Sequence, residues 1–434
     1  SNKLYDSNNT IIGNVMMEHV VNLKCLICGN EYGPDDIDYV CPDHGNEGIV
    51  DVQYDYDLIS RRLSQGDLLH STNHTIWRYK PLLPVEPDAP VPPLTVGWTP
   101  LYRTDRLAAD LGLNHLWIKD DGRLPTASFK DRASAIAIVK AQEKQAKMIA
   151  VASTGNAAAA LSGLCASVRQ PNVIFVPESA PQAKIAQLLV FGSKVLLVEG
   201  SYDDAFDLCM DAVAEYGWYN RNTGYNPYMT EGKKTVSFEI CEQLGWKAPD
   251  RVFVSVGDGC IIGGGHKGFK DLLALGWIDH MPKIMGVQAT CSAYLYEAWK
   301  NGEDVLTKPP IAAQTVADSI SAGLPRDRLK AMAAVKETDG AYIAVTDEEI
   351  LAAIPALARG SGVFAEPAGA TAYAGLLKAI EDNLVTADER IVVINTGNGL
   401  KDVAGAMKGV GLTDTKAQHV KPDIDHLKRL LNSE

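Results

Sequence analysis

From about residue 95 onward, the chain alternates short apolar runs with longer helical patterns, and this alternation constrains the fold more than any other feature. A run such as Val173-Ile174-Phe175-Val176 has no polar residue between its apolar ones, which is typical of a strand buried on both faces. Strands of this kind that alternate with helices predict an α/β fold with a mostly parallel sheet. The expected strands span 115–120, 148–153, 172–178, 194–200, 251–257, 284–289 and 390–396, and the expected helices span roughly 128–145, 156–170, 181–192, 202–216, 266–275, 347–359 and 370–382.

Length and charge narrow the class of protein. A chain of 434 residues predicts two or three domains. The formal net charge of −13 argues against nucleic acids and anionic membranes as partners. No apolar run reaches the roughly 18 residues of a membrane span, and the first residues lack a signal pattern. We therefore expect a cytoplasmic protein that binds a small molecule.

The first residues form a separate segment, at about 15–60, with a metal-binding pattern. Cys25 and Cys28 form one tight turn, and Cys41 and His44 form a second turn about a dozen residues later. Three thiolates and one imidazole at this spacing predict a small ribbon that holds a structural zinc ion, since four protein ligands leave no open position. The alternative is a ribbon that keeps the ligands without the metal. The other five cysteines are scattered singly and are expected to act as small core residues.

Lys130 is the strongest candidate for a reactive group. It follows the strand at 115–120 and opens the next helix, where open α/β sheets bind their ligands. The positive end of that helix would lower the pKa of the lysine, which suits a lysine that forms an imine with an aldehyde. The alternative is an ordinary helix start, with Ser128 as N-cap and Asp131 three residues later.

Polar and glycine-rich segments close three other strands. Ser153-Thr154-Gly155-Asn156 closes one strand, and its asparagine can both donate and accept hydrogen bonds. The turn Gly257–Gly265 has five glycines in nine residues and precedes a helix, which favours phosphate binding over a merely flexible turn. Thr396 follows the last strand, where its hydroxyl could bond a heterocyclic nitrogen. An imine-forming lysine, a phosphate loop and a neutral hydroxyl together suit pyridoxal phosphate.

With these motifs in this order, the chain resembles the threonine synthase branch of the fold-type-II pyridoxal phosphate enzymes, which are similar to the tryptophan synthase β subunit. The resemblance covers nearly the whole length. It is carried by the N-terminal Cys-x-x-Cys region with 50–55, and by Trp98–Arg103, Ser128–Arg132, Ser153–Asn156, Asn226–Tyr228 with Glu231-Gly232 and Lys234-Thr235, Glu366–Ala368 and Thr396–Asp402.

The resemblance implies a role for each matching residue. Lys130 would hold the cofactor and shuttle protons, Asn156 would contact the phenolic oxygen of the cofactor, and Thr396 would face its ring nitrogen. The phosphate of the cofactor would lie on Gly257, Asp258, Gly259, Cys260 and Ile261. The residues expected at the substrate are Ser153, Thr154, Gly155, Lys233 and Lys234.

The resemblance also implies two lobes with the cofactor between them, in a homodimer. The small lobe would span 140–215, and the large lobe 76–139 and 216–434. Four positions depart from the family pattern: Met229 stands where the family usually has arginine, Lys233 where it has glutamine, Asp258 where it has asparagine, and Cys260 where it has glycine. The arginine helps threonine synthases to bind the phosphate of their substrate, and methionine has neither its charge nor its fork of donors.

The implied activity is a lyase that converts O-phosphohomoserine and water to threonine and phosphate. The departures keep a second enzymatic hypothesis open, in which the same cofactor serves β-elimination or β-replacement on another amino acid, as in an ammonia-lyase, a dehydratase or a cysteate synthase-like enzyme. A third hypothesis is a non-catalytic homologue that binds metal or a partner through the ribbon, which the intact Lys130 argues against.

Overall fold

The computed structural model describes residues 4–5, 11–12, 17–153, 155–180 and 182–432, and its largest sheet has six strands in the order β14-β13-β12-β15-β7-β6. Neighbouring strands of this sheet run parallel, except that the edge strand β6 runs antiparallel to β7. This confirms the predicted α/β class. The strands are β6 Leu101–Arg103, β7 His115–Asp120, β12 Arg251–Ser255, β13 Lys283–Ala289, β14 Ala341–Val345 and β15 Arg390–Asn395.

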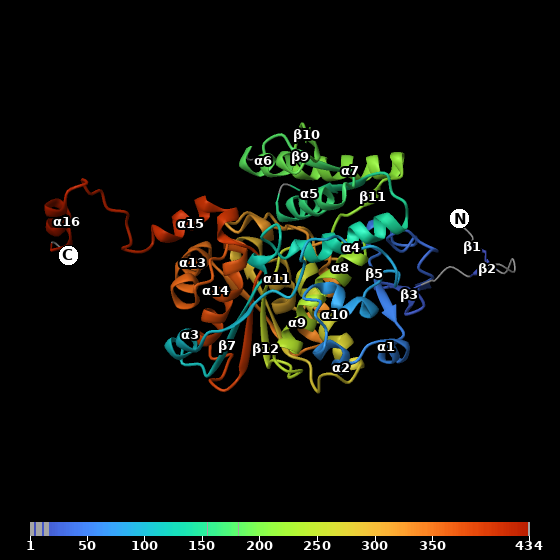
Figure 1. The fold of residues 1–434 in the computed structure, drawn as a ribbon, viewed down its shortest axis with the longest axis horizontal. Helices are drawn as coiled ribbons and strands as arrows, with labels where there is room; N and C mark the ends of the chain where they lie inside the picture. Colours follow the sequence, from blue (N-terminus) through green and yellow to red (C-terminus); the bar gives the residue numbers. More distant parts are fainter. Residues whose placement is uncertain (1–3, 6–10, 13–16, 154, 181, 433–434) are drawn as a thin grey trace.

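A second, smaller sheet lies above the first in Figure 1, and its four strands are parallel in the order β10-β9-β8-β11. Every residue of β8 and β9 is buried, which explains why their sequences show no alternation. The strands are β8 Ile149–Ala152, β9 Asn172–Pro177, β10 Lys194–Val198 and β11 Tyr219–Asn220, and the connecting helices are α5 Asn156–Val168, α6 Gln182–Val190 and α7 Tyr202–Tyr216.

Helix α4, Lys130–Glu143, packs against α5 of the smaller sheet and against α8, Tyr228–Lys233, of the larger part, so it connects the two. The remaining longer helices belong to the larger part, except α16, which lies apart from the body of the molecule in Figure 1 and buries no residue. They are α9 Thr235–Gln243, α10 Cys260–Ala274, α11 Tyr294–Asn301, α12 Arg328–Lys336, α13 Asp347–Ser361, α14 Pro367–Glu381, α15 Val403–Val410 and α16 Ile424–Leu431. No helix in the described part of the chain has the length and apolar character that crossing a membrane requires.

The N-terminal segment forms a three-stranded antiparallel sheet that is docked onto the larger part through polar contacts. Its strands are β3 Val20–Cys25, β4 Glu31–Tyr32 and β5 Val50–Tyr54. The hydroxyl of Tyr54 donates to Glu231 of α8 at 2.5 Å, and Lys267 of α10 donates to Asp51 at 2.6 Å. The ribbon therefore rests on the helix that begins at the glycine-rich turn.

One sequence-based expectation is wrong at that turn. The glycines 257–265 were expected to form one long loop before a helix at 266, but α10 already begins at Cys260. Close packing explains why glycines occur inside this helix: a Cβ at Gly264 would lie 2.6 Å from Cβ of Lys233, and one at Gly263 would lie 2.8 Å from Cβ of Lys330. These glycines allow neighbouring helices to approach α10. Of the segment 257–261, which we still call the turn, Gly257, Asp258 and Gly259 precede the helix, and Cys260 and Ile261 are its first residues.

A fully buried ion network fixes the start of α4 at the end of β7. The guanidinium of Arg132 donates to Asp121 at 2.7 Å and to Glu239 of α9 at 2.6 Å, and Lys119 of β7 lies 2.7 Å from Glu239. Burial alone would raise the pKa of Glu239, but Arg132 and Lys119 outweigh it and lower the pKa to about 2. Because Lys130 is two residues before Arg132, the network also fixes the position of Lys130.

Arg132→Leu should lower the free energy of unfolding by about 3–5 kcal/mol, because it leaves two buried carboxylates with a single cation. The measurement is the urea midpoint of the cofactor-free protein. Arg103→Leu is the matched control, since its ion pair with Asp105 is exposed and such pairs contribute about 1 kcal/mol or less. Equal midpoints for the two variants would contradict the anchoring role of the network.

Candidate cofactor and substrate site

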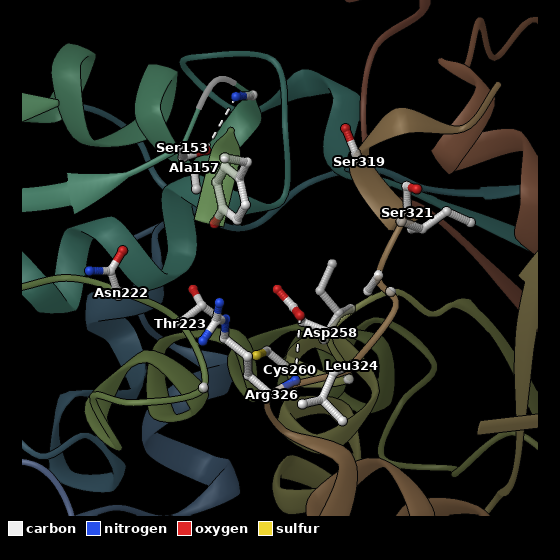
Figure 2. Close-up of a pocket in the computed structure, with 18 of the residues that line it drawn as sticks. Ser153, Ala157, Asn222, Thr223, Asp258, Cys260, Ser319, Ser321, Leu324 and Arg326 are labelled. Atoms are coloured by element: carbon white, nitrogen blue, oxygen red, sulfur yellow. Dashed lines mark hydrogen bonds between the residues drawn. The ribbon is translucent and has the colours of Figure 1, made fainter. Parts of the chain in front are cut away.

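A cavity of about 690 Å³ opens where the carboxyl ends of the two parallel sheets face each other. The smaller sheet contributes Ser153 and Ala157 on one side, and the larger part contributes Asp258 and Cys260 on the other, as Figure 2 shows. Lys130, Asn156 and Thr396 also line the cavity, as do all five residues of the turn 257–261. The structure therefore brings together the residues that the sequence assigned to the cofactor.

Lys130 is the first residue of α4, at the start of a helix of 14 residues. Burial lowers the pKa of its ammonium, which increases the neutral, nucleophilic fraction of the amine. The alternative of an ordinary helix start with Ser128 as N-cap is wrong, because the structure places Phe129 at the N-cap position. Asp131 instead accepts from the backbone N–H of Thr126 at 2.7 Å, and burial raises the pKa of its carboxyl to about 6.

The turn 257–261 shows why small residues are needed beside the cavity. Gly259 has φ +90°, and a Cβ at Gly257 would lie 2.7 Å from Cα of Ile320. Cys260 is the first residue of α10, so its backbone is at the positive end of a 15-residue helix. The backbone and the helix end together suit the binding of an anion.

Two buried cations lie close to this turn. Lys233 is fully buried, and no hydrogen-bond partner for its Nζ is found among the described residues. Burial lowers its pKa to about 7, with the positive charges of Lys130 and Arg221 acting in the same direction. Arg221 is also fully buried and donates to the hydroxyls of Ser134 and Thr223, while burial lowers its pKa to about 10. Both cations are thus placed for an anion that the protein itself does not supply.

Glu366 is a cavity residue to which the sequence gave no role. Its carboxylate accepts from Nδ2 of Asn156 at 2.7 Å, and burial raises its pKa to about 7. A Cβ at Gly397 would lie 2.0 Å from Glu366, so the glycine after Thr396 makes room for this carboxylate. The sequence signal was Glu366-Pro367-Ala368, which marks the start of α14 but does not reveal the contact with Asn156.

Only some of the residues expected at the substrate line the cavity. Ser153 and Gly155 line the cavity, whereas Thr154 lies outside the described residues. Lys233 is packed behind the cavity wall. Lys234 is fully buried in ion pairs with Glu231 at 2.5 Å and Asp271 at 2.7 Å. Met229, on the same short helix, is also buried.

The N-terminal segment brings its four candidate ligands together. The ligand atoms of Cys25, Cys28, Cys41 and His44 all lie within 4.8 Å of one another, which is close enough for one metal ion. Cys25 and Cys41 are buried, and all three cysteines are free thiols.

Comparison with known proteins agrees with this arrangement. Residues 93–397 match the family described as pyridoxal-phosphate dependent enzyme. The chain is 38% identical to the threonine synthase of Methanocaldococcus jannaschii, over 94% of this chain and 98% of that protein. It is 40% identical to the threonine synthase of Methanosarcina acetivorans, over 88% and 92% of the two chains.

Solved structures share the fold. The processed form of threonine deaminase isoform 2 from Solanum lycopersicum superposes with a TM-score of 0.63 at 24% identity, over 73% of this chain and 88% of that one. Diaminopropionate ammonia lyase from Escherichia coli superposes with a TM-score of 0.60 at 20% identity, over 72% and 87%. At these identities the likeness concerns architecture alone. The matched family, the long alignments and the cavity built around Lys130 together show that the chain belongs to the threonine synthase family of pyridoxal phosphate-dependent lyases.

Proposed function

We propose that the protein converts O-phosphohomoserine and water to threonine and phosphate. The observation that carries this proposal is the convergence of Lys130, Asn156, Thr396 and the 257–261 turn on one cavity, in a chain whose relatives along nearly its full length are named threonine synthases. From the family resemblance, we also propose that it works as a homodimer in the cytoplasm.

The residues of the cavity fit pyridoxal phosphate. The guanidinium of Arg221 in the cavity and the amides at the start of α10 can neutralise a phosphate dianion, helped by the charge of Lys233 behind the wall, whose Nζ has no hydrogen-bond partner among the described residues. Lys130 supplies the amine for the aldehyde, and the hydroxyl of Thr396 and the amide of Asn156 are polar partners for the ring. When bound, the cofactor would supply the electron sink for a carbanion at Cα of the substrate.

The protein's own groups then control the proton transfers. We expect Lys130 to remove the protons at Cα and Cβ and to return protons at Cγ and Cα, and its lowered pKa favours an amine that can both accept and return a proton. Ser153 and Gly155 line the cavity just before α5 begins, and we expect them to bind the substrate carboxylate. The phosphate leaves from Cγ, and water adds at Cβ.

Lys130→Ala should lower kcat by at least about 10³-fold, since it removes the cofactor's anchor and the acid–base group together. The measurement is phosphate and threonine formation from O-phosphohomoserine, with the visible absorbance of the lysine-bound cofactor recorded in parallel. Lys144→Ala, a change at a partly exposed lysine near Asp38, is the matched control and should behave as wild type. Residual turnover near the wild-type level would refute the role of Lys130.

Lys233→Met should have opposite effects on two properties. It should weaken the binding of pyridoxal phosphate about 10- to 100-fold, because a positive charge behind the wall that faces the phosphate is lost. It should also stabilise the cofactor-free protein, because a buried ammonium without a carboxylate partner is replaced by an apolar side chain. Equilibrium titration with pyridoxal phosphate and urea unfolding measure the two effects.

The pH dependence of the second effect follows from the pKa of Lys233. The folded pKa of about 7 lies below the ordinary value of 10.5, so the unfolded chain binds more protons between these pH values. The stability of the wild type therefore rises with pH across this window, and the advantage of Lys233→Met should be largest below pH 7 and fade towards pH 10. Lys247→Met, at an exposed lysine, should show neither effect.

A second candidate function rests on Met229 and Lys233. Met229 is buried and apolar where the family usually has an arginine for the substrate phosphate, while Lys233 brings a cation to α8. These changes favour a substrate whose phosphate leaves from Cβ, with an incoming nucleophile at the same carbon. In a cysteate synthase-like reaction, O-phosphoserine and sulfite would give cysteate and phosphate, with the new C–S bond replacing the C–O bond.

A phosphate-release assay with two substrates distinguishes the two candidate functions. Phosphate release from O-phosphohomoserine with threonine as product supports the first function. Phosphate release from O-phosphoserine only when sulfite is present supports the second. Loss of phosphate from O-phosphoserine with pyruvate and ammonia as products would instead indicate β-elimination.

A further inference from the structure

Two ligand atoms of the ribbon, one from each turn, have the spacing of a tetrahedral zinc site, and all four lie within 4.8 Å of one another. Sγ of Cys28 and Sγ of Cys41 are 3.9 Å apart. With Zn–S bonds of about 2.3 Å, tetrahedral geometry separates two sulfur atoms by about 3.8 Å. The spacing therefore fits zinc without rearrangement of the two turns.

The surroundings of these atoms also suit a metal. Nε2 of His44 is buried, and no hydrogen-bond partner for it is found within the described ranges. The backbone N–H of Ile27 donates to Sγ of Cys25 at 3.4 Å, and the hydroxyl of Tyr32 is 3.1 Å from Sγ of Cys41. Such donors stabilise the negative charge of thiolate ligands, and a metal ion would satisfy the imidazole.

The second of these turns is short and tightly closed. The N–H of Cys41 donates to the carbonyl of Gly48 at 2.8 Å, and the N–H of Glu47 donates to the carbonyl of His44 at 3.2 Å. Between Cys41 and Gly48, the five residues Pro42, Asp43, Gly45, Asn46 and Glu47 are exposed, so the turn has little apolar packing of its own. If a metal holds Cys41 and His44, the hydrogen bonds also fix Glu47.

Glu47 connects this turn to the wall of the cavity. Its carboxylate forms an ion pair with Nη2 of Arg328, whose side chain is 6% exposed. Arg328 also donates to the carbonyls of Val305 at 2.8 Å and Pro325 at 3.1 Å. Asn46, Glu47 and Arg328 all line the cavity.

The segment beside Arg328 reaches the phosphate-binding turn. The N–H of Asp327 donates to the carbonyl of Asp258 at 2.9 Å, and the N–H of Arg326 lies 3.4 Å from a carboxylate oxygen of Asp258. Figure 2 shows Arg326 and Leu324 next to Asp258 and Cys260 at the cavity. Contacts therefore run without a gap from His44 through Glu47 and Arg328 to Asp258.

We propose that Cys25, Cys28, Cys41 and His44 bind one zinc ion, and that this ion holds Glu47 against Arg328 and thereby keeps the 320–328 wall of the cavity in place. Zinc is then a positioning element for the site, although no position of its coordination sphere is open for substrate. The wall is expected to loosen whenever the metal or Glu47 is removed.

The first test measures zinc content and compares variants of two exposed cysteines. Purified holoenzyme should contain about one zinc per chain by elemental analysis, Cys28→Ser should contain almost none, and Cys291→Ser should match wild type. Both cysteines are exposed, but only Cys28 belongs to the ribbon. A wild-type enzyme purified without metal that also fails to take up added zinc would overturn the proposal.

Hydrogen exchange tests whether zinc stabilises the 320–328 wall of the cavity or only the ribbon itself. In Cys28→Ser, amide exchange should accelerate about tenfold in both 41–48 and 320–328, while β9 should stay protected. Glu47→Gln should keep its zinc and the protection of 41–48 but show the acceleration in 320–328. If amides 320–328 exchange at the wild-type rate in both variants, the coupling between the zinc site and the wall is refuted. If Cys28→Ser does not fold, the exchange rate of 320–328 in Glu47→Gln decides the question alone.

A kinetic arm rests on the proposed function. Glu47→Gln should raise KM for O-phosphohomoserine about 5- to 10-fold while kcat changes less than about twofold, because Glu47 shapes the cavity wall and does not reach Lys130. The double variant Cys28→Ser/Glu47→Gln should be no worse than Cys28→Ser alone, since both changes act on one path. If the wild type does not turn over this substrate, the proposed function fails, while metal content and exchange still judge the zinc proposal.

Discussion

The buried contact of Arg132 with Asp121 and Glu239 supports the geometry of the whole site. It joins the end of β7, the first turn of α4 and helix α9 at a point with no access to solvent. A buried charge without its partners is costly, so these three elements hold their relative positions or the protein loses stability. Lys130 is placed by this requirement, two residues from the guanidinium, and does not depend on the cofactor to find its position.

Two other buried cations near Lys130, in contrast to Arg132, have no carboxylate paired with them in the described part of the chain. Lys233 and Arg221 are buried without carboxylate partners in reach of a hydrogen bond or ion pair among the described residues, although both are close to the turn that begins α10. Within the described ranges, the protein thus pairs its buried charges at Arg132 and leaves positive charge without a carboxylate where we propose that an anion binds. The lowered pKa values of both groups express the same cost.

The ribbon belongs to the same system of contacts. Tyr54 and Lys267 dock it onto α8 and α10, and Glu47 joins it to Arg328 at the cavity. A small N-terminal segment can therefore influence the site without supplying a group that reacts. Through these contacts, a metal site without an open coordination position can affect substrate binding by holding the cavity wall in place.

Local sequence determined the parallel α/β class, the strand ends that line the cavity and the lysine among them, because apolar runs and glycine-rich strand ends follow from short-range sterics and burial. It also indicated the four ribbon ligands, because their spacing is local. Tertiary structure alone decided that α10 begins at Cys260, that Glu366 meets Asn156 and that Glu47 reaches Arg328. It also decided that Lys234 is paired while Lys233 has no partner within the described part of the chain. These facts depend on contacts between residues up to 281 positions apart, and no local pattern encodes such a distance.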